Sequence, residues 1–133
     1  MTDRVAAEFP LATFLGMTIE RTAPGAAAAR LTVRSEHLNP HGSVHGAVLF
    51  AMVDTAMGAA TLSVLEEGTL CASIEVQLRF CKPVFEGVLV AATEVLQAGK
   101  RIVHLEGRVH DARGELVGLA TGSFAVIATD NAG

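Results

Sequence analysis

The sequence predicts an α+β fold in which one long helix lies across one face of an antiparallel sheet. The stretch from Gly46 to Leu65 contains twenty residues and a single charged side chain, that of Asp54, so as a helix it should be buried. Two strand-like segments precede this stretch and four follow it, joined by short turns that favour antiparallel hairpins. An antiparallel sheet with one face to cover, and a single apolar helix to cover it, make a complete core.

Before the long helix we expect short elements separated by turn residues. In chain order these are a helical turn at 8–15, strands at 17–23 and 26–35, and a loop at 37–45. The helical turn would pack Phe9, Leu11 and Phe14 against the rest of the chain. Pro40 and Gly42 interrupt any helix in the loop, so its polar residues lead irregularly into the long helix.

The long helix is expected at 46–66, with Gly68 suited to a C-terminal cap. Four strands follow, at 72–80, 87–97, 101–110 and 115–128. In the first of these strands the side chains alternate strictly, which puts Ser73 on the face opposite to Ile74 and Val76. We expect one domain over 1–133, with its core at 9–128 and a polar tail from Thr129 that frays.

The composition excludes several classes of protein. Half of the 133 residues are hydrophobic and 18% are charged, which is incompatible with disorder. A formal net charge of −4 without any Lys/Arg run gives no basis for nucleic-acid binding. Twenty apolar residues could span a bilayer, but Asp54 lies near their middle and no Lys or Arg flanks them, so we expect a core helix and no membrane partner. So much apolar surface in a small chain also favours burial between subunits.

The cysteines and the N-terminus indicate a cytoplasmic protein. Cys71 and Cys81 lie ten residues apart in one predicted strand, hence roughly 30 Å apart, too far for a disulfide bond. Free thiols are typical of a reducing compartment. Residues 1–10 contain no apolar segment of the secretory type.

Asp54 and Gly46 are the first candidate functional residues. A carboxylate on an apolar helix carries a desolvation cost and is rarely kept without a partner or a function. Gly46 stands at the predicted helix N-terminus, where free N–H groups and a partial positive charge suit a carbonyl oxygen that gains negative charge. A glycine also suits a simple transition from loop to helix, and both interpretations of Gly46 stay open.

The loop before the helix supplies further candidates. Asn39 could hold a carbonyl group or a water molecule, or form an ordinary Asn-Pro turn. His45 could act as a general base, although positioning of the helix start is favoured. His37, His41 and His45 are spaced by four residues, but the intervening proline and glycine break the helix that would align them, so no metal site is expected. The chain also lacks a phosphate-binding loop, a dinucleotide fingerprint and a serine nucleophile elbow.

Together these residues resemble the pattern of the hotdog-fold thioesterases, most closely the phenylacetic-acid-degradation type, which is related to the 4-hydroxybenzoyl-CoA thioesterases. In that family an Asn precedes the first Gly of His-Gly-Gly by seven residues, and a helical Asp follows eight residues later. Asn39, Gly46 and Asp54 have these spacings, while Ala47 stands where the second Gly is common. The resemblance covers residues 9–128 and implies the hotdog fold, a long central helix wrapped by an antiparallel sheet of five to six strands.

The resemblance also implies a reaction, the hydrolysis of an acyl-CoA thioester to a free acid and CoA without a cofactor. The Gly46 N–H would polarise the thioester carbonyl, and Asp54 would activate water as a general base or attack as a nucleophile. Ser73, matched by position, would hold water or the carboxylate, while Asn39 and His45 would shape the site.

Substrate binding can be assigned only to candidates. The acyl group stays open among aryl, arylacetyl and medium-chain types. The residues that could contact substrate, the last three of them through CoA phosphates, are Val44, Ala47, Phe50, Lys82, Lys100 and Arg101.

The spacing of Gly46 and Asp54 predicts an oligomer. Eight residues on one helix correspond to roughly 12 Å along its axis, too far for both groups to act on one carbonyl. If both are catalytic, Gly46 of one subunit must face Asp54 of another, as in hotdog dimers. We therefore expect an obligate homodimer, assembled further into a homotetramer as a dimer of dimers.

Two other functions are compatible with the same fold. Asn39-Pro40 is similar to part of the Asp-x-Asn-Pro-x-His segment of hotdog hydratases, but His37 and Gly42 stand at the two catalytic positions of that segment. A non-catalytic acyl-CoA-binding module would need the pocket without the acid, so Asp54 argues against it.

Overall fold

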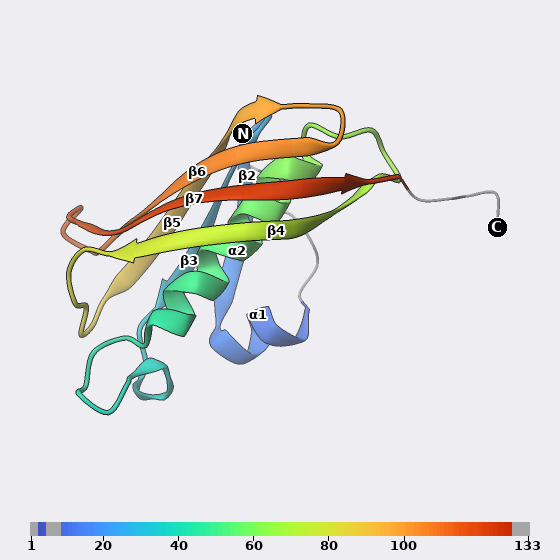
Figure 1. Cartoon of the computed structure of the whole chain (residues 1–133). Helices are drawn as coiled ribbons and strands as arrows, with labels where there is room; N and C mark the ends of the chain where they lie inside the picture. Colours follow the sequence, from blue (N-terminus) through green and yellow to red (C-terminus); the bar gives the residue numbers. More distant parts are fainter. Residues whose placement is uncertain (1–2, 5–8, 129–133) are drawn as a thin grey trace.

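The computed structural model describes residues 3–4 and 9–128, which form one curved antiparallel sheet around a central helix (Figure 1). The strands are β1 (Asp3–Arg4), β2 (Met17–Ala23), β3 (Ala26–Thr32), β4 (Leu70–Phe80), β5 (Val88–Ala98), β6 (Ile102–His110) and β7 (Leu116–Ile127). The helices are α1 (Pro10–Leu15), the 3₁₀ turn η1 (Ser35–His37) and α2 (Gly46–Leu62). In this part of the chain the sheet has seven strands in the order β1-β2-β3-β5-β6-β7-β4. The predicted fold class is confirmed, and the two-residue β1 is an addition that the pattern did not predict.

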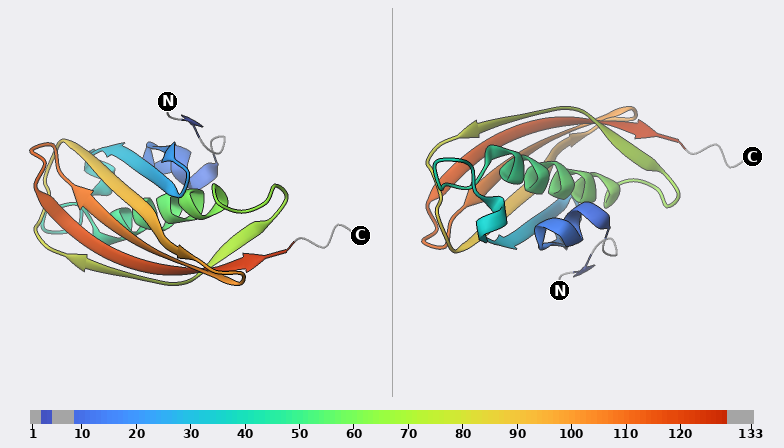
Figure 2. Two further views of the ribbon diagram at one scale, coloured as in Figure 1. Left: turned by 90° about the horizontal axis from the view of Figure 1, so that it is seen from above. Right: turned by 90° about the horizontal axis from the view of Figure 1, so that it is seen from below.

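Helix α2 packs into the concave face of the sheet, as the two further views show (Figure 2). Its inward residues are almost free of solvent contact, and the helix contacts every strand from β2 to β7. The most buried of them are Met52, Val53, Ala56, Met57 and Ala60. Because β4 forms one end of the sheet, its outer edge has no neighbouring strand within the described chain.

The C-terminal end of α2 differs from the prediction. The helix ends at Leu62 rather than near residue 66, and Ser63 is its C-cap. The Ser63 hydroxyl donates to the Ala60 carbonyl at 2.7 Å and accepts a hydrogen bond from the Gly25 N–H, also at 2.7 Å. This tertiary contact ends the helix early, and Gly68, with φ of 87°, belongs to the turn before β4.

Two predictions for the N-terminal elements are also corrected. Leu11 and Phe14 of α1 were expected to pack inward, but they are 49% and 73% exposed, while Ala12 is buried. The strand predicted at 26–35 ends at Thr32, since the chain turns into η1 three residues later.

A β-bulge in β4 changes which face Ser73 occupies. Ser73 pairs with Phe124 of β7 and Glu75 pairs with Ser123, so Ile74 is the extra residue. Ile74 is therefore 56% exposed, and Ser73 lies on the helix side of the sheet, where Val76 also packs. The predicted strict alternation across this strand is wrong at the bulge.

One side of α2 is not covered within the chain. Ala47, Phe50 and Leu62 are exposed, and Asp54 and Gly58 on the same side are half-buried. The all-round burial expected of this apolar helix therefore does not occur in the single chain. Among the described residues no helix is both long and apolar enough to cross a bilayer.

Candidate active site

The loop before α2 is organised by Asn39. Its Oδ1 accepts hydrogen bonds from the backbone N–H groups of His41, at 2.9 Å, and Ser43, at 3.2 Å. Its Nδ2 donates to the Ser43 hydroxyl at 2.9 Å. Both ends of the Asn39 amide thus hold the turn together, and Asn39 also lines a cavity at the start of α2 together with Val44.

His45 is the N-cap of α2. Its Nδ1 accepts a hydrogen bond from the Ala47 N–H at 2.9 Å, which leaves Nε2 as the protonated nitrogen of the neutral ring. The backbone N–H of His45 donates to the His37 carbonyl at 2.8 Å. The ring of His45 therefore helps to fix the first turn of the helix.

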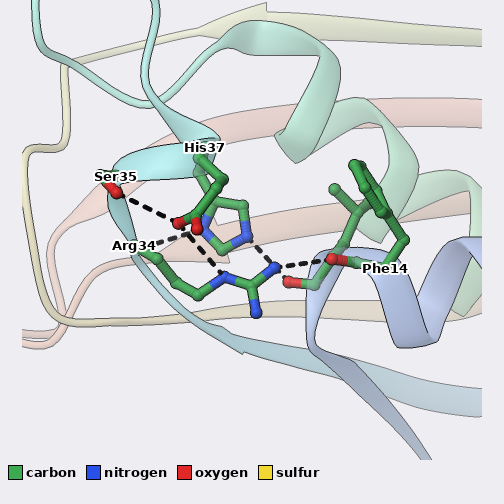
Figure 3. A network of polar contacts seen from close by, with 6 residues as sticks. Phe14, Arg34, Ser35 and His37 are labelled. Atoms are coloured by element: carbon green, nitrogen blue, oxygen red, sulfur yellow. Dashed lines mark hydrogen bonds and ion pairs between the residues drawn. The ribbon is translucent and has the colours of Figure 1, made fainter.

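A network around His37, which the sequence did not predict, ties this loop to α1 (Figure 3). The buried His37 ring accepts from the Arg34 N–H at 2.9 Å through Nδ1, and its Nε2 donates to the Leu15 carbonyl at 2.8 Å. The Arg34 guanidinium donates to the Phe14 carbonyl at 2.6 Å. Two carbonyls at the end of α1 thus find side-chain partners in the segment that leads to the N-cap of α2.

Gly46 is the first residue of α2, as predicted, and its backbone is closely approached. A Cβ at position 46 would lie 2.7 Å from Cζ of Phe80, so a side chain there would displace the ring. Among the residues that the structure describes, none accepts a hydrogen bond from the Gly46 N–H. Gly46 lines the cavity at the helix start, whose volume is about 420 Å³. An N–H without a partner at a helix N-terminus can bind an oxygen that carries negative charge.

Asp54 lines a different cavity, of about 480 Å³, on the uncovered side of α2. Its Oδ1 is buried and has no hydrogen-bond partner within the described chain. Burial raises the pKa of Asp54 above its usual range, and the nearby Ser73 hydroxyl opposes part of this shift. The Asp54 charge in turn adds to the effect of burial in raising the pKa of the Cys71 thiol. Asp54, Ser73 and Cys71 are therefore brought together, with the carboxylate in an apolar setting.

The structure does not bring all the predicted site residues together. Asn39, Val44, Gly46 and Lys82 line the first cavity, and Asp54 and Ser73 line the second. Within one chain the Gly46 N–H and the Asp54 carboxylate therefore face separate spaces. Ala47 and Phe50 lie on the exposed side of α2 and are not among the residues that line either of these two cavities.

The three candidate phosphate-binding residues lie at two ends of the sheet. Lys82 follows β4 and forms ion pairs with Asp111, at 3.4 Å, and with Glu115. Lys100 and Arg101 occupy the turn between β5 and β6, which lies at the end of the sheet opposite to Lys82. Their assignment to CoA phosphates stays a prediction.

Within the described residues, the cysteines form no disulfide bond and the histidines form no cluster that could bind a metal. Cys71 and Cys81 are free thiols. Within residues 3–4 and 9–128, no group of three or more His, Cys, Asp or Glu side chains is placed to hold a metal ion. The evenly spaced histidines differ in setting, since His37 is buried among backbone partners whereas His41 is exposed.

Comparison with known proteins gives the class of this chain. Residues 41–118 match a family model described as the thioesterase superfamily. The acyl-coenzyme A thioesterase PaaI of Escherichia coli is 34% identical over 88 residues, which are 65% of this chain and 61% of that protein. The solved structure of E. coli PaaI superposes with a TM-score of 0.81 at 30% identity, covering 88% of this chain and 83% of the other.

Two further solved structures share the fold of this chain. AziG of S. sahachiroi has a TM-score of 0.85 at 26% identity and covers 91% of this chain and 98% of its own. A thioesterase from Haemophilus influenzae has a TM-score of 0.84 at 22% identity, over 89% of this chain and 82% of the other, and shows the shared fold alone. The chain belongs to the thioesterase superfamily, with the hotdog fold, and it is a thioester hydrolase of the PaaI type.

Proposed function

We propose that this chain hydrolyses an acyl-CoA thioester to a free acid and CoA, with Asp54 as the acting carboxylate. The observation that carries the proposal is the buried Oδ1 of Asp54, which has no partner within the described chain and lies in a mainly apolar cavity. Burial of a carboxylate without a partner destabilises the fold, and such groups are common at functional sites. The acyl-CoA substrate is proposed from the similarity to E. coli PaaI, whose name states that activity.

In the proposed reaction the Gly46 N–H donates a hydrogen bond to the thioester carbonyl oxygen, which gains negative charge as the carbonyl carbon is attacked. In one route Asp54 takes a proton from water while the water oxygen bonds to the carbonyl carbon. The C–S bond then breaks, and the proton passes to the CoA thiolate. In the other route an Asp54 oxygen attacks the carbonyl carbon, CoA thiolate leaves, and water hydrolyses the resulting anhydride. Neither route needs a cofactor, and Ser73 would orient the water or the carboxylate.

The proposal includes a site shared between two subunits. The uncovered side of α2 is apolar, and the outer edge of β4 is open for pairing with another strand. On β4, Phe80 lies against Gly46 and Ser73 lies in the cavity of Asp54. Antiparallel pairing of two β4 edges about a two-fold axis would bring Phe80 of one subunit toward the partner's Ser73. The Gly46 N–H of one subunit would then approach the partner's Asp54.

The same two-fold axis bears on CoA binding. The two ends of β4 are roughly 30 Å apart, because eleven residues rise about 3.3 Å each. Antiparallel pairing would place the partner's turn with Lys100 and Arg101 at the end of the sheet where Lys82 lies. Phosphate binding by these residues, a further dimerisation to a tetramer and a cytoplasmic location are parts of the proposal.

The test is thiol release from a panel of acyl-CoA thioesters by the wild type and by Asp54→Asn. Asparagine keeps the size of the side chain but can neither take a proton nor attack, so we expect turnover to fall by about 10² or more. Circular dichroism should show the same fold for both proteins. Unchanged thiol release would overturn the role of Asp54.

Two outcomes would replace the proposed function altogether. Hydration of crotonyl-CoA without thiol release would indicate a hydratase. Tight binding of acyl-CoA by the wild type without any turnover would indicate a binding module.

A further inference from the structure

Gly58 follows Asp54 by one turn of α2 and lines the same cavity. The other walls of this space are mainly apolar and come from the chain before β2, from β2, from α2, from β4 and from β7. The large apolar residues among them are Phe9, Ile19, Leu62 and Phe124. Among the described residues that line it, Asp54 alone carries a charge.

The fold itself gives no reason for a glycine at position 58. Among the described residues a Cβ there would meet only Cε2 of Phe124, at 3.7 Å, an ordinary contact distance. Gly58 is also not among the glycines with positive φ. In contrast, a Cβ at Gly46 would clash with Phe80, and one at Gly122 would lie 2.5 Å from Sδ of Met57. Glycine inside a helix is less stable than alanine, so α2 carries a destabilising residue that its packing does not require.

We propose that Gly58 determines acyl specificity by leaving open a channel along α2 for an uncharged, medium-chain acyl group. The carbonyl end of this group would lie at Asp54, and the chain would pass over Gly58 toward Leu62. This inference rests on the proposed thioesterase function. The two ends of the channel are roughly 12 Å apart, since they are eight residues apart on the helix.

The lining also decides the chemical class of the acyl group. Phe9, Ile19 and Leu62 offer only apolar surface, which favours a hydrocarbon chain. An acyl group with a second carboxylate would be desolvated without a cation among the described lining residues and would lie close to the charge of Asp54. Succinyl-CoA is therefore expected to be a poor substrate compared with octanoyl-CoA.

The experiment compares Gly58→Leu with the wild type on acetyl-, butyryl-, octanoyl- and succinyl-CoA. The leucine would fill the channel, so kcat/KM for octanoyl-CoA should fall by about tenfold or more, while acetyl-CoA changes by less than about threefold. Gly58→Ala should give a smaller loss in the same order, with Tm unchanged or higher by a few degrees. Leu62→Ala lengthens the channel and should shift the preference toward longer chains. Gln97 is exposed and does not line this cavity, so Gln97→Leu should leave the dependence of kcat/KM on acyl chain length unchanged.

A second measurement separates this inference from the proposed function. Octanoyl-CoA binding is measured by calorimetry on Asp54→Asn with and without Gly58→Leu, where no turnover is needed. About tenfold weaker binding with the leucine supports the channel, even if the wild type releases no thiol.

The role of Gly58 is overturned if Gly58→Leu lowers kcat/KM equally for all chain lengths. It is also overturned if sedimentation shows that this variant loses its oligomeric state, because Gly58 would then serve close contact between subunits. Failure of the proposed function would give a different result, in which the wild type releases no thiol from any acyl-CoA.

Discussion

The ring of Phe80 occupies the space in which residue 46 would carry a side chain. A Cβ on Gly46 would lie 2.7 Å from Cζ of Phe80 and 2.9 Å from its Cε1. The end of the edge strand β4 therefore lies directly over the first turn of α2. Glycine at position 46 has two separable roles, since it accommodates Phe80 and leaves its N–H accessible.

Gly46→Ala separates the two roles of this residue. We expect a destabilisation of about 1–3 kcal/mol, because the new methyl group must displace the Phe80 ring, together with a fall in turnover of about tenfold or more. In a Phe80→Ala background the same substitution should cost little stability, as measured by urea unfolding. Turnover should still fall, because the methyl group also hinders approach of a thioester to the N–H. Full activity of the double variant relative to Phe80→Ala would show that Gly46 serves packing alone.

The raised pKa of Asp54 predicts how stability depends on pH. The folded protein binds a proton at Asp54 more tightly than the unfolded chain, so the free energy of unfolding falls as pH rises from the ordinary value of about 4 through the raised value. Above that range the ionised carboxylate is destabilising. Asp54→Asn should therefore raise the free energy of unfolding at pH 7, at equal protein concentration, by an amount that solvent screening of the half-exposed carboxylate keeps small. The same shift should place the acid limb of the wild-type kcat/KM profile above pH 4.

A variant that is less stable than the wild type at pH 7 would contradict this prediction. It would show that the Asp54 charge has a stabilising partner in the assembled protein. The pH dependence of unfolding provides the control, because the difference between the two proteins should shrink as the pH is lowered toward 4.

His37 predicts an effect on both stability and activity, although it lies outside the two cavities. His37→Ala would leave the Arg34 N–H and the Leu15 carbonyl without their partner in a partly buried position, at a cost of about 2–4 kcal/mol. The His37 carbonyl accepts a hydrogen bond from the His45 N–H. Loss of the His37 side-chain contacts should let this segment shift, so the N-cap of α2 should loosen and turnover should fall. His41→Ala on the same loop is the matched control and should change stability by less than about 0.5 kcal/mol. Equal effects of the two substitutions in thermal unfolding would exclude a special role for His37.

The parts of this fold that were predicted correctly depend on neighbours in sequence. The start of α2 and the order of the strands follow from polar and apolar periodicity, which is local. The face occupied by Ser73 does not, because the bulge at Ile74 depends on pairing with β7, some fifty residues further along the chain. The His37 network likewise requires the Leu15 carbonyl, which no spacing among histidines reveals.

The early end of α2 and the uncovered side of that helix have the same explanation. Ser63 ends the helix through the N–H of Gly25, a contact between residues far apart in sequence. The apolar side that carries Phe50 and Asp54 was expected to be buried, and the single chain does not bury it. Apolar periodicity indicates that a surface will be covered, but it does not state which molecule covers it.

The shared site predicts that two inactive variants restore activity to each other. Gly46→Ala hinders access to the proposed N–H donor, and Asp54→Asn lacks the proposed acting carboxylate. When the two chains are coexpressed, a site made from the Gly46 of an Asp54→Asn chain and the partner's Asp54 is intact. Random pairing forms such a site in about one case of four, so thiol release should return to about a quarter of the wild-type rate.

The result distinguishes sharply between a shared site and a site within one chain. If Gly46 and Asp54 of the same chain acted together, every site in the mixture would carry one defect, and activity would stay at the level of the separate variants. A mixture of Asp54→Asn with Asp54→Asn,Gly46→Ala is the control, because it has the same interfaces but no intact carboxylate. A fully active monomer in sedimentation analysis would contradict the shared site independently of this mixture. The cavities of Gly46 and Asp54 are separate within one chain, and a second subunit is the simplest way to bring both groups to one carbonyl.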